Sequence, residues 1–428
     1  MIALSNRIPN MRQDLEKIIK EWWDNPLPLI VHRELDLFSY YNFPVKKIIT
    51  LVGFRRSGKT YSFFSLAQKI GKGNTVYINF EDERIPNNIS VLTTLIDVLT
   101  TLSGSKNYTL LMDEIQAIDG WERWARRVIE TTNHKLFVTG SSSKLASSEL
   151  PTELRGRSLT INSKPLNFKE FLSFKNMDIK LLPKPKILNL LHEYLKYGGF
   201  PEVVLVDEGK KTLILDEYYK TFVKRDIIER HKIRNREVLT NLIKLLLNSP
   251  TYTISKLPNS LKSLGFDVSK TTISKYISYL EESYFIKIGE LHTKSIKNRM
   301  KAPKKIYFVD NFFISKFSNN FSQNLGRLME NLIANNLTDF YYWKDYQNHE
   351  VDFIIRNEEI VTDLIQASYA SSFDEIDERE TRSLVKASKE LKCNSAKIIT
   401  WNLKGEIKKK KLTIKLIPLT EFLLDMVQ

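Results

Sequence analysis

The chain has 428 residues and a mass of 50.0 kDa, more than a single ordinary hydrophobic core supports, so we expect several domains. Its 42% hydrophobic residues are typical of a globular protein and exclude a disordered or fibrous chain. No apolar run approaches the roughly 20 residues that span a bilayer, and no secretory signal is visible. The single cysteine, Cys393, excludes an internal disulfide framework. We therefore expect a cytoplasmic protein with no membrane partner.

The charge of the chain is strongly positive, at +15 with a pI near 9.4. An excess of this size attracts polyanions, of which nucleic acid is the usual one. A lysine-rich solvated surface would give the same composition, and the charge alone does not separate the two interpretations.

The first part of the chain alternates short apolar runs with helical patterns. Strands are expected at residues 46–54, 75–80, 108–112 and 135–139, and helices at 61–70, 89–102 and 121–131. Continuous apolar strands that alternate with helices predict an α/β fold with a parallel sheet covered on both faces.

The remainder of the chain divides into three further segments. After Pro165 only helix-period patterns follow, up to about residue 233. Helices at 236–247, 255–264 and 269–281 then precede strand-like runs at 284–291 and 304–309. The last segment has helices at 325–338 and 374–391 and strands at 340–343, 350–355, 361–367 and 397–400. The expected domains are 1–164, 165–233, 234–305 and 306–428.

The sequence Gly-Phe-Arg-Arg-Ser-Gly-Lys-Thr at residues 53–60 follows the first strand directly. Glycines at both ends let the backbone N–H groups turn around a phosphate, and the following helix directs its positive end at the anion. Lys59 would contact the β- and γ-phosphates and Thr60 would bind Mg²⁺. The predicted nucleotide-binding residues are Gly53, Arg55, Arg56, Ser57, Gly58, Lys59, Thr60 and Tyr61.

Two carboxylates follow the third apolar strand, at Asp113 and Glu114. In a P-loop site the first would hold the Mg²⁺ shell through water, and the second would polarise the attacking water. A solvated strand end is the alternative interpretation of the pair. With Thr60, Asp113 forms the predicted Mg²⁺ site, and Glu114 is the predicted general base.

Two further catalytic candidates lie after the fourth strand. Ser141 could sense the γ-phosphate, with Thr139 and Ser142 as alternates, although a hydroxyl-rich helix cap explains these residues nearly as well. Arg157, or Arg155, could reach the nucleotide of a neighbouring subunit as an arginine finger. An ordinary basic surface turn carries comparable weight.

With these pieces in place, the chain resembles the archaeal and bacterial AAA-type ATPases that carry a C-terminal domain of unknown function. The resemblance covers nearly the whole length and implies ATP as the nucleotide and a helical lid. Beside the P-loop and His32-Arg33, it is carried by LLMDEIQ (110–116), VTGSSS (138–143), ELRGR (153–157), YGGFPEV (197–203), VKRDI (223–227), YFVDNF (307–312), LGRLMENLI (325–333) and EVDFII (350–355).

The segment 234–305 looks like a winged helix-turn-helix, with residues 269–280 as the recognition helix. Its predicted core face carries Ile273, Ile277 and Leu280. The predicted exposed face for duplex DNA carries Lys270, Thr271, Ser274 and Lys275. A basic wing of Lys294, Lys297, Arg299, Lys301, Lys304 and Lys305 would follow the phosphates. Winged helices also serve in protein–protein contacts, which is the alternative.

The last segment resembles the restriction-endonuclease-like α/β fold, whose active members bind Mg²⁺ with a helix Glu, a strand Asp and a Glu-x-Lys. Glu330 and Asp352 match the two acids, with Glu350 beside them. Gln366 and Ser368 replace the third acid and the lysine, so we expect a degenerate nuclease site, with Asp363 as a candidate substitute ligand.

The leading hypothesis is an ATPase that couples its nucleotide state to DNA or partner binding by its C-terminal half, alone or as a homo-oligomer. An ATP-dependent nuclease is the first alternative, and Gln366 and Ser368 count against it. An ATP-gated signalling switch or scaffold with little turnover is the second.

Overall fold

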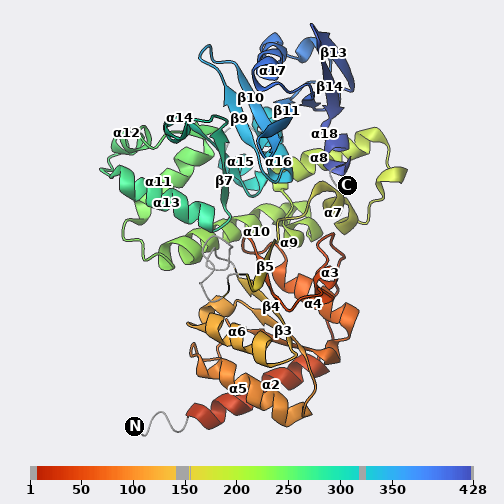
Figure 1. The fold of residues 1–428 in the computed structure, drawn as a ribbon, viewed down its shortest axis with the longest axis vertical. Helices are drawn as coiled ribbons and strands as arrows, with labels where there is room; N and C mark the ends of the chain where they lie inside the picture. Colours follow the sequence, from red (N-terminus) through yellow and green to blue (C-terminus); the bar gives the residue numbers. More distant parts are fainter. Residues whose placement is uncertain (1–6, 141–153, 155, 318–323, 426–428) are drawn as a thin grey trace. The chain divides into compact units, whose positions relative to one another are not determined.

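The computed structural model describes residues 7–140, 154, 156–317 and 324–425. Contacts within the chain divide it into two units, Met1–Lys164 and Pro165–Gln428, and each unit is considered by itself below (Figure 1).

The first unit contains a five-stranded sheet in the order β2-β3-β4-β1-β5, and every pair of neighbours is parallel. All residues of β1 and β3 are buried, as expected for strands in the middle of a parallel sheet with both faces covered. The predicted parallel α/β fold is thus confirmed. The strands are β1 (Ile48–Val52), β2 (Thr75–Asn79), β3 (Thr109–Asp113), β4 (Lys135–Gly140) and β5 (Ser158–Asn162).

Strand β5 was not predicted from the sequence. It lies at the edge of the sheet beside β1, and only Ile161 among its apolar residues is buried. A short edge strand with alternating polar residues gives a weak apolar signal, which explains the omission.

Helices surround this sheet and bury its apolar side chains. Phe63, Leu66 and Ala67 of α4 pack against Leu51 and Phe137 of the sheet. The N-terminal helix α2 packs on α5 and on β2, and α2 and α5 lie side by side in Figure 1. The helices are α2 (Arg7–Asp24), α3 (Phe38–Tyr41), α4 (Lys59–Ile70), α5 (Ser90–Ser103) and α6 (Trp121–Thr131).

The second unit begins with a helical segment. Every regular element of residues 165–233, all of which are described, is helical. The first helix starts with a capping box, in which the side chains of Asn167 and Glu170 each accept from the other's backbone N–H. The elements are α7 (Phe168–Phe174), α8 (Lys184–Tyr197), α9 (Pro201–Leu205), α10 (Glu208–Thr221) and a π-helix (Phe222–Glu229).

A nine-stranded mixed sheet forms the centre of the rest of the second unit, in the order β13-β14-β12-β11-β10-β9-β7-β8-β6. Its strands are β6 (Thr251–Tyr252), β7 (Ile286–Leu291), β8 (Lys304–Phe308), β9 (Tyr341–Lys344), β10 (Glu350–Asn357), β11 (Ile360–Ser368), β12 (Ala396–Thr400), β13 (Gly405–Lys409) and β14 (Leu412–Pro418). The hairpin β13–β14 was not predicted, because the lysine run at its turn masks the period-2 pattern.

The helices of this part pack on the sheet or beside it, and α17 contacts β10 and β11 (Figure 1). They are α11 (Arg236–Leu247), α12 (Leu257–Lys262), α13 (Lys270–Glu282), α14 (Ile296–Lys301), α15 (Asn311–Phe317), α16 (Leu325–Asn336), α17 (Glu378–Leu391) and α18 (Leu419–Asp425).

One sheet runs through both of the last two predicted domains. Strand β7 pairs with β8 on one side and, in parallel, with β9 on the other. The expected boundary between residues 305 and 306 falls inside β8. The segment with the three predicted helices therefore shares a continuous backbone hydrogen-bond network with the segment that follows it.

A buried carboxylate joins two of the sequence motifs within the second unit. Asp310 accepts hydrogen bonds from the backbone N–H groups of Gly199 (2.8 Å) and Phe312 (2.9 Å). Burial raises the pKa of Asp310 to about 6. Gly198 has a φ of +75°, and a Cβ there would lie 1.6 Å from Asp310 Oδ1. The close approach and the left-handed backbone both require glycine at this position.

We predict that Gly198→Ala destabilises the protein by about 3 kcal/mol, because the new methyl group must displace a buried, hydrogen-bonded carboxylate. Gly209→Ala is the matched control, since among the described residues only the chain neighbours and backbone of α10 itself approach a Cβ at this position within 4 Å. Urea unfolding of the full chain measures both changes. Equal stability of the two variants would contradict the assignment.

Candidate functional site

The loop between β1 and α4 has the backbone shape that its glycines predict. Gly53 has a φ of +144° and Gly58 a φ of +96°. A Cβ on Gly53 would lie 2.2 Å from the backbone oxygen of Ser163. Any larger residue at position 53 would therefore push the loop away from the chain that follows β5.

The Lys59 side chain is folded into this loop and is almost fully buried. Its Nζ donates to the carbonyl oxygens of Gly53 (3.0 Å) and Phe54 (3.2 Å). The ammonium is thus held inside the turn, at the start of α4. Positive charge, the N–H groups of the first turn of α4 and the helix dipole all converge there.

Arg33 and Ser163, which the motif did not assign to the site, both support the loop. Arg33 Nη1 donates to the backbone oxygen of Ser57 at 2.7 Å, and Nη2 donates to that of Lys164 at 3.0 Å. Ser57 is buried, and its Oγ lies 3.3 Å from Ser163 Oγ. Arg33 was visible only as part of a family block, and Ser163 gave no signal in the sequence.

Asp113, the last residue of β3, is the polar centre of the site. Its Oδ2 accepts from Thr60 Oγ1 (2.7 Å) and from the hydroxyl of Tyr77 (2.9 Å), and its Oδ1 accepts from Thr139 Oγ1. Burial raises the pKa of the Asp113 carboxyl and Glu114 raises it further, whereas the hydroxyl donors lower it. Three elements, α4, β2 and β4, therefore meet on one carboxylate.

Thr139 connects the two acidic residues. Its hydroxyl donates to Asp113 and accepts from the backbone N–H of Glu114 at 3.0 Å. Glu114 has a φ of +53°, which turns the chain sharply after the strand. The side chain of Gln116 donates to Glu114 Oε2. Thr139, the alternate to Ser141, thus contacts the carboxylate of Asp113 and the backbone of Glu114, whereas Tyr77 was not predicted to take part.

Among the described candidates, Arg157 is not brought to the carboxylates. Ser141, Ser142 and Arg155 lie outside the described residues. Arg157 directly precedes β5, its backbone oxygen accepts from Ile48 N, and its side chain pairs with Glu130 at 2.9 Å. It thus lies at the start of β1, whereas the P-loop follows the end of that strand.

The remaining P-loop candidates lie around the loop. Arg55 pairs with Glu81 at a distance of 3.6 Å. Arg56 is exposed and has a φ of +66°. Tyr61, in the first turn of α4, is 49% exposed, so its ring is available to a ligand.

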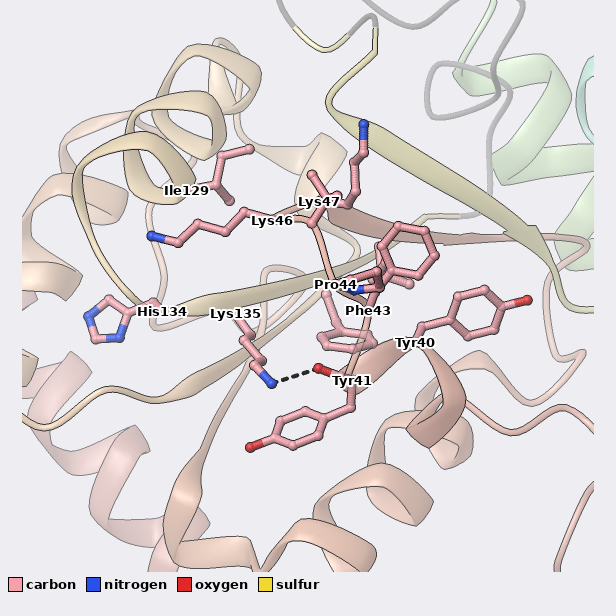
Figure 2. Close-up of a pocket in the computed structure, with 12 residues that line it drawn as sticks. Tyr40, Tyr41, Phe43, Pro44, Lys46, Lys47, Ile129, His134 and Lys135 are labelled. Atoms are coloured by element: carbon pink, nitrogen blue, oxygen red, sulfur yellow. Dashed lines mark hydrogen bonds between the residues drawn. The ribbon is translucent and has the colours of Figure 1, made fainter.

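A pocket of the first unit lies at the opposite edge of the sheet, where β1 and β4 begin (Figure 2). Lys135 Nζ donates to the backbone oxygen of Tyr41 at 2.6 Å, and Lys46 Nζ donates to that of Thr132 at 2.9 Å. Burial lowers the pKa of His134. These two lysines of the pocket are thus bound to backbone carbonyls, and the pocket is separate from the P-loop.

The predicted recognition helix corresponds to α13, with Ser269 as its N-cap accepting from Thr272 N. Ile273, Ile277 and Leu280 are buried. The opposite side of the helix is exposed to solvent and carries Lys270, Thr271, Ser274 and Lys275. The predicted division of this helix into a core face and an exposed face is confirmed.

Glu330 of α16 and Asp352 of β10 do come together, with Glu350, around the ammonium of Lys305; these three carboxylates are the acid cluster below. Gln366 lies beside them, and its Oε1 accepts from Asp352 N at 3.3 Å. Asp363 instead binds Ser395 and Lys397, so the expected substitute ligand is wrong. In the described part of the chain, no three Asp, Glu, His or Cys side chains form a ready set of metal ligands.

The expected wing also needs correction at two lysines. Lys305 is buried in β8 and holds the acid cluster. Lys304 pairs with Glu290 at 2.5 Å. Between β7 and β8, where every residue is described, the chain forms the short helix α14 in place of an extended basic wing.

We predict that Thr139→Val destabilises the protein by about 1–3 kcal/mol, because it removes the hydrogen bonds that the Thr139 hydroxyl makes with the buried Asp113 carboxylate and with Glu114 N–H. Thr50→Val on the neighbouring strand β1 is the matched control. Thr50 is equally buried, and its hydroxyl makes no hydrogen bond within the described residues. Denaturant unfolding should find the control neutral or slightly stabilised, and equal losses in both variants would contradict a polar role for Thr139.

Comparison with family models places residues 45–172 in an AAA domain and residues 188–324 in a domain of unknown function, DUF8612. In the described residues, no helix is both long and apolar enough to span a membrane. Among solved structures, a Walker-type ATPase of Pyrococcus abyssi is similar with a TM-score of 0.46 and 14% identity, over 68% of this chain and 99% of that chain.

Two relatives match over most of their length. The uncharacterized protein MJ1544 of Methanocaldococcus jannaschii is 37% identical over 393 residues, which cover 88% of this chain and 86% of the relative. An uncharacterized protein of Haemophilus influenzae is 32% identical over 340 residues, which cover 76% of this chain and 84% of the relative. The chain therefore belongs to one family with these two proteins, and its residues 45–172 match an AAA domain.

Proposed function

We propose that this protein hydrolyses ATP at the P-loop of its first unit and that the nucleotide state controls DNA binding by its second unit. The observation that carries the first half is the convergence of Thr60 and Thr139 on Asp113, with Glu114 held beside them. A P-loop that bound the nucleotide without hydrolysing it would not need a second carboxylate, Glu114, directly after Asp113.

The residues present fit a magnesium–nucleotide complex. Thr60 and Asp113 are oxygen donors in direct contact at 2.7 Å, and hydroxyl and carboxylate oxygens are the ligands that Mg²⁺ takes directly or through water. These two residues would hold the ion, which when bound neutralises charge on the β- and γ-phosphates. The loop N–H groups and the Lys59 ammonium would bind the same phosphates.

Glu114 is the residue that we assign to hydrolysis. Its carboxylate would accept a proton from the attacking water, and the contact from Gln116 fixes the side chain. Thr139 positions Glu114 through its backbone N–H. Arg157 lies at the other edge of its own sheet, so in this proposal it can stabilise the transferring phosphoryl group only in a neighbouring copy within a homo-oligomer.

We predict that Glu114→Gln lowers kcat for ATP by about 100-fold or more while nucleotide binding is retained, because the amide cannot take up the proton. Asp119→Asn, an exposed carboxylate on the same connection, is the control and should leave turnover unchanged. Phosphate release measures hydrolysis and a fluorescent ATP analogue measures binding. Wild-type turnover in Glu114→Gln would contradict the role of Glu114 as general base, whereas nucleotide binding without turnover in the wild-type protein would favour a nucleotide-binding switch.

The proposed DNA-binding element is the segment of α11, α12 and α13 with the strands β6, β7 and β8, which we interpret as a winged helix-turn-helix. Three helices followed by an antiparallel hairpin match that motif. Lys270 and Lys275 are exposed on α13, flanked by the hydroxyls of Thr271 and Ser274. These groups suit contacts with phosphates and base edges, and the net charge of +15 favours a polyanion.

We predict that replacing Lys270 and Lys275 with Ala weakens duplex DNA binding and lowers the slope of log K against log salt by about two, because two phosphates are no longer neutralised by the protein. Replacing Lys408 and Lys409 of β13, which are also exposed, removes the same charge elsewhere on this unit. Fluorescence anisotropy over a salt series compares the two. Equal effects would show that only the total charge matters.

A further inference from the structure

The acid cluster of the second unit surrounds one buried ammonium. Lys305 Nζ lies 3.0 Å from Glu330 Oε1, 3.0 Å from Glu350 Oε1 and 2.7 Å from Asp352 Oδ1. The three carboxylates come from α16 and β10, whereas the lysine comes from β8. Although burial alone would lower it, these carboxylates raise the pKa of Lys305 well above its usual value. Three carboxylates thus surround one ammonium, which is the arrangement that a cation site requires.

Other donors also contact the three carboxylates of the cluster. Tyr307 donates its hydroxyl to Glu330 at 2.8 Å, and Lys344 donates to Glu350 Oε2 at 3.1 Å. Asp352 Oδ2 accepts from the backbone N–H of Ala367 at 2.9 Å. Each carboxylate thus has a partner besides Lys305. Donors of the chain itself thus contact every carboxylate of the set, which stabilises a polar network of this kind.

Three carboxylates this close together need a cation, and a protein can supply it in two ways. It can bind a divalent ion, which takes carboxylate oxygens at about 2.0–2.6 Å. It can also insert an ammonium, which takes them at the hydrogen-bond distances seen here. A tethered lysine is always present, so a divalent ion would have to displace both it and the hydrogen bonds around it.

We propose that the Lys305 ammonium takes the place of a divalent cation in the acid cluster, so that this site binds no metal and carries out no metal-dependent hydrolysis. The residues at the remaining expected position agree with this proposal. Gln366 directs its oxygen to the backbone of Asp352, and Ser368 carries no charge. The proposal concerns the second unit only and does not rest on ATP hydrolysis by the first.

The test is a titration of the full chain with Mn²⁺ in the absence of nucleotide. Electron paramagnetic resonance measures binding as the loss of the signal of the free ion. Four proteins are compared: wild type, Asp352→Asn, Lys305→Ala, and the double variant Lys305→Ala/Asp352→Asn. Any Mn²⁺ that binds near Asp113 is common to all four, so it cancels in the differences.

We predict that wild type and Asp352→Asn give the same titration, whereas Lys305→Ala gains a saturable Mn²⁺ site that the double variant lacks. With the ammonium removed, the repelling carboxylates gain a cation from solution, so Mn²⁺ should also raise the Tm of Lys305→Ala and of no other variant.

Two results would overturn the proposal. One is a Mn²⁺ site in wild type that Asp352→Asn removes, since the ion would then displace Lys305 in the native protein. The other is a folded Lys305→Ala that binds no more Mn²⁺ than the double variant. If Lys305→Ala does not fold, Lys305→Met keeps the aliphatic stem in place, and the comparison of wild type with Asp352→Asn still decides the first point.

Discussion

The candidate site of the first unit depends on how one buried carboxylate is solvated. Asp113 has almost no contact with water, and it accepts hydrogen bonds from the hydroxyls of Thr60, Tyr77 and Thr139 instead. Because these residues lie on α4, β2 and β4, the carboxylate fixes the P-loop helix relative to both neighbours of β3. Neutral hydroxyls leave the negative charge of Asp113 uncompensated, which is the condition under which a metal ion adds most.

The second unit stabilises its carboxylates with a cation of the chain itself. There the ammonium of Lys305 contacts three carboxylates, of which Asp352 is buried and Glu330 and Glu350 are partly exposed. A buried ion pair removes the charge that would attract a metal, and removing either partner leaves a costly unpaired charge. The first arrangement is suited to bind a magnesium–nucleotide complex, and the second to hold a fold together without one. The chemistry that we propose for this protein is therefore confined to the first unit.

The sequence predicted most of the nucleotide site, because its parts are local. Gly53, Gly58, Lys59 and Thr60 follow a strand in one continuous motif, and the two acids lie at the end of another strand and directly after it. The roles of Tyr77 and Lys305 could not be assigned, because they depend on contacts between distant parts of the chain. Tyr77 contacts Asp113, which is 36 positions away, and Lys305 contacts Asp352, which is 47 positions away. A lysine in a basic stretch was expected to be exposed, and only the pairing of β8 with β7 and β6 reveals that position 305 is buried. Strands β5 and β13 were missed for a related reason, as edge strands carry few apolar residues.

The link between nucleotide and DNA is the central claim, and steady-state ATP turnover with and without duplex DNA tests it most directly. The account predicts that saturating duplex DNA changes kcat of the wild-type protein, and that the change disappears when Lys270 and Lys275 are replaced, with basal turnover intact. An unchanged kcat at a DNA concentration where binding is demonstrated would contradict coupling between the P-loop and the second unit.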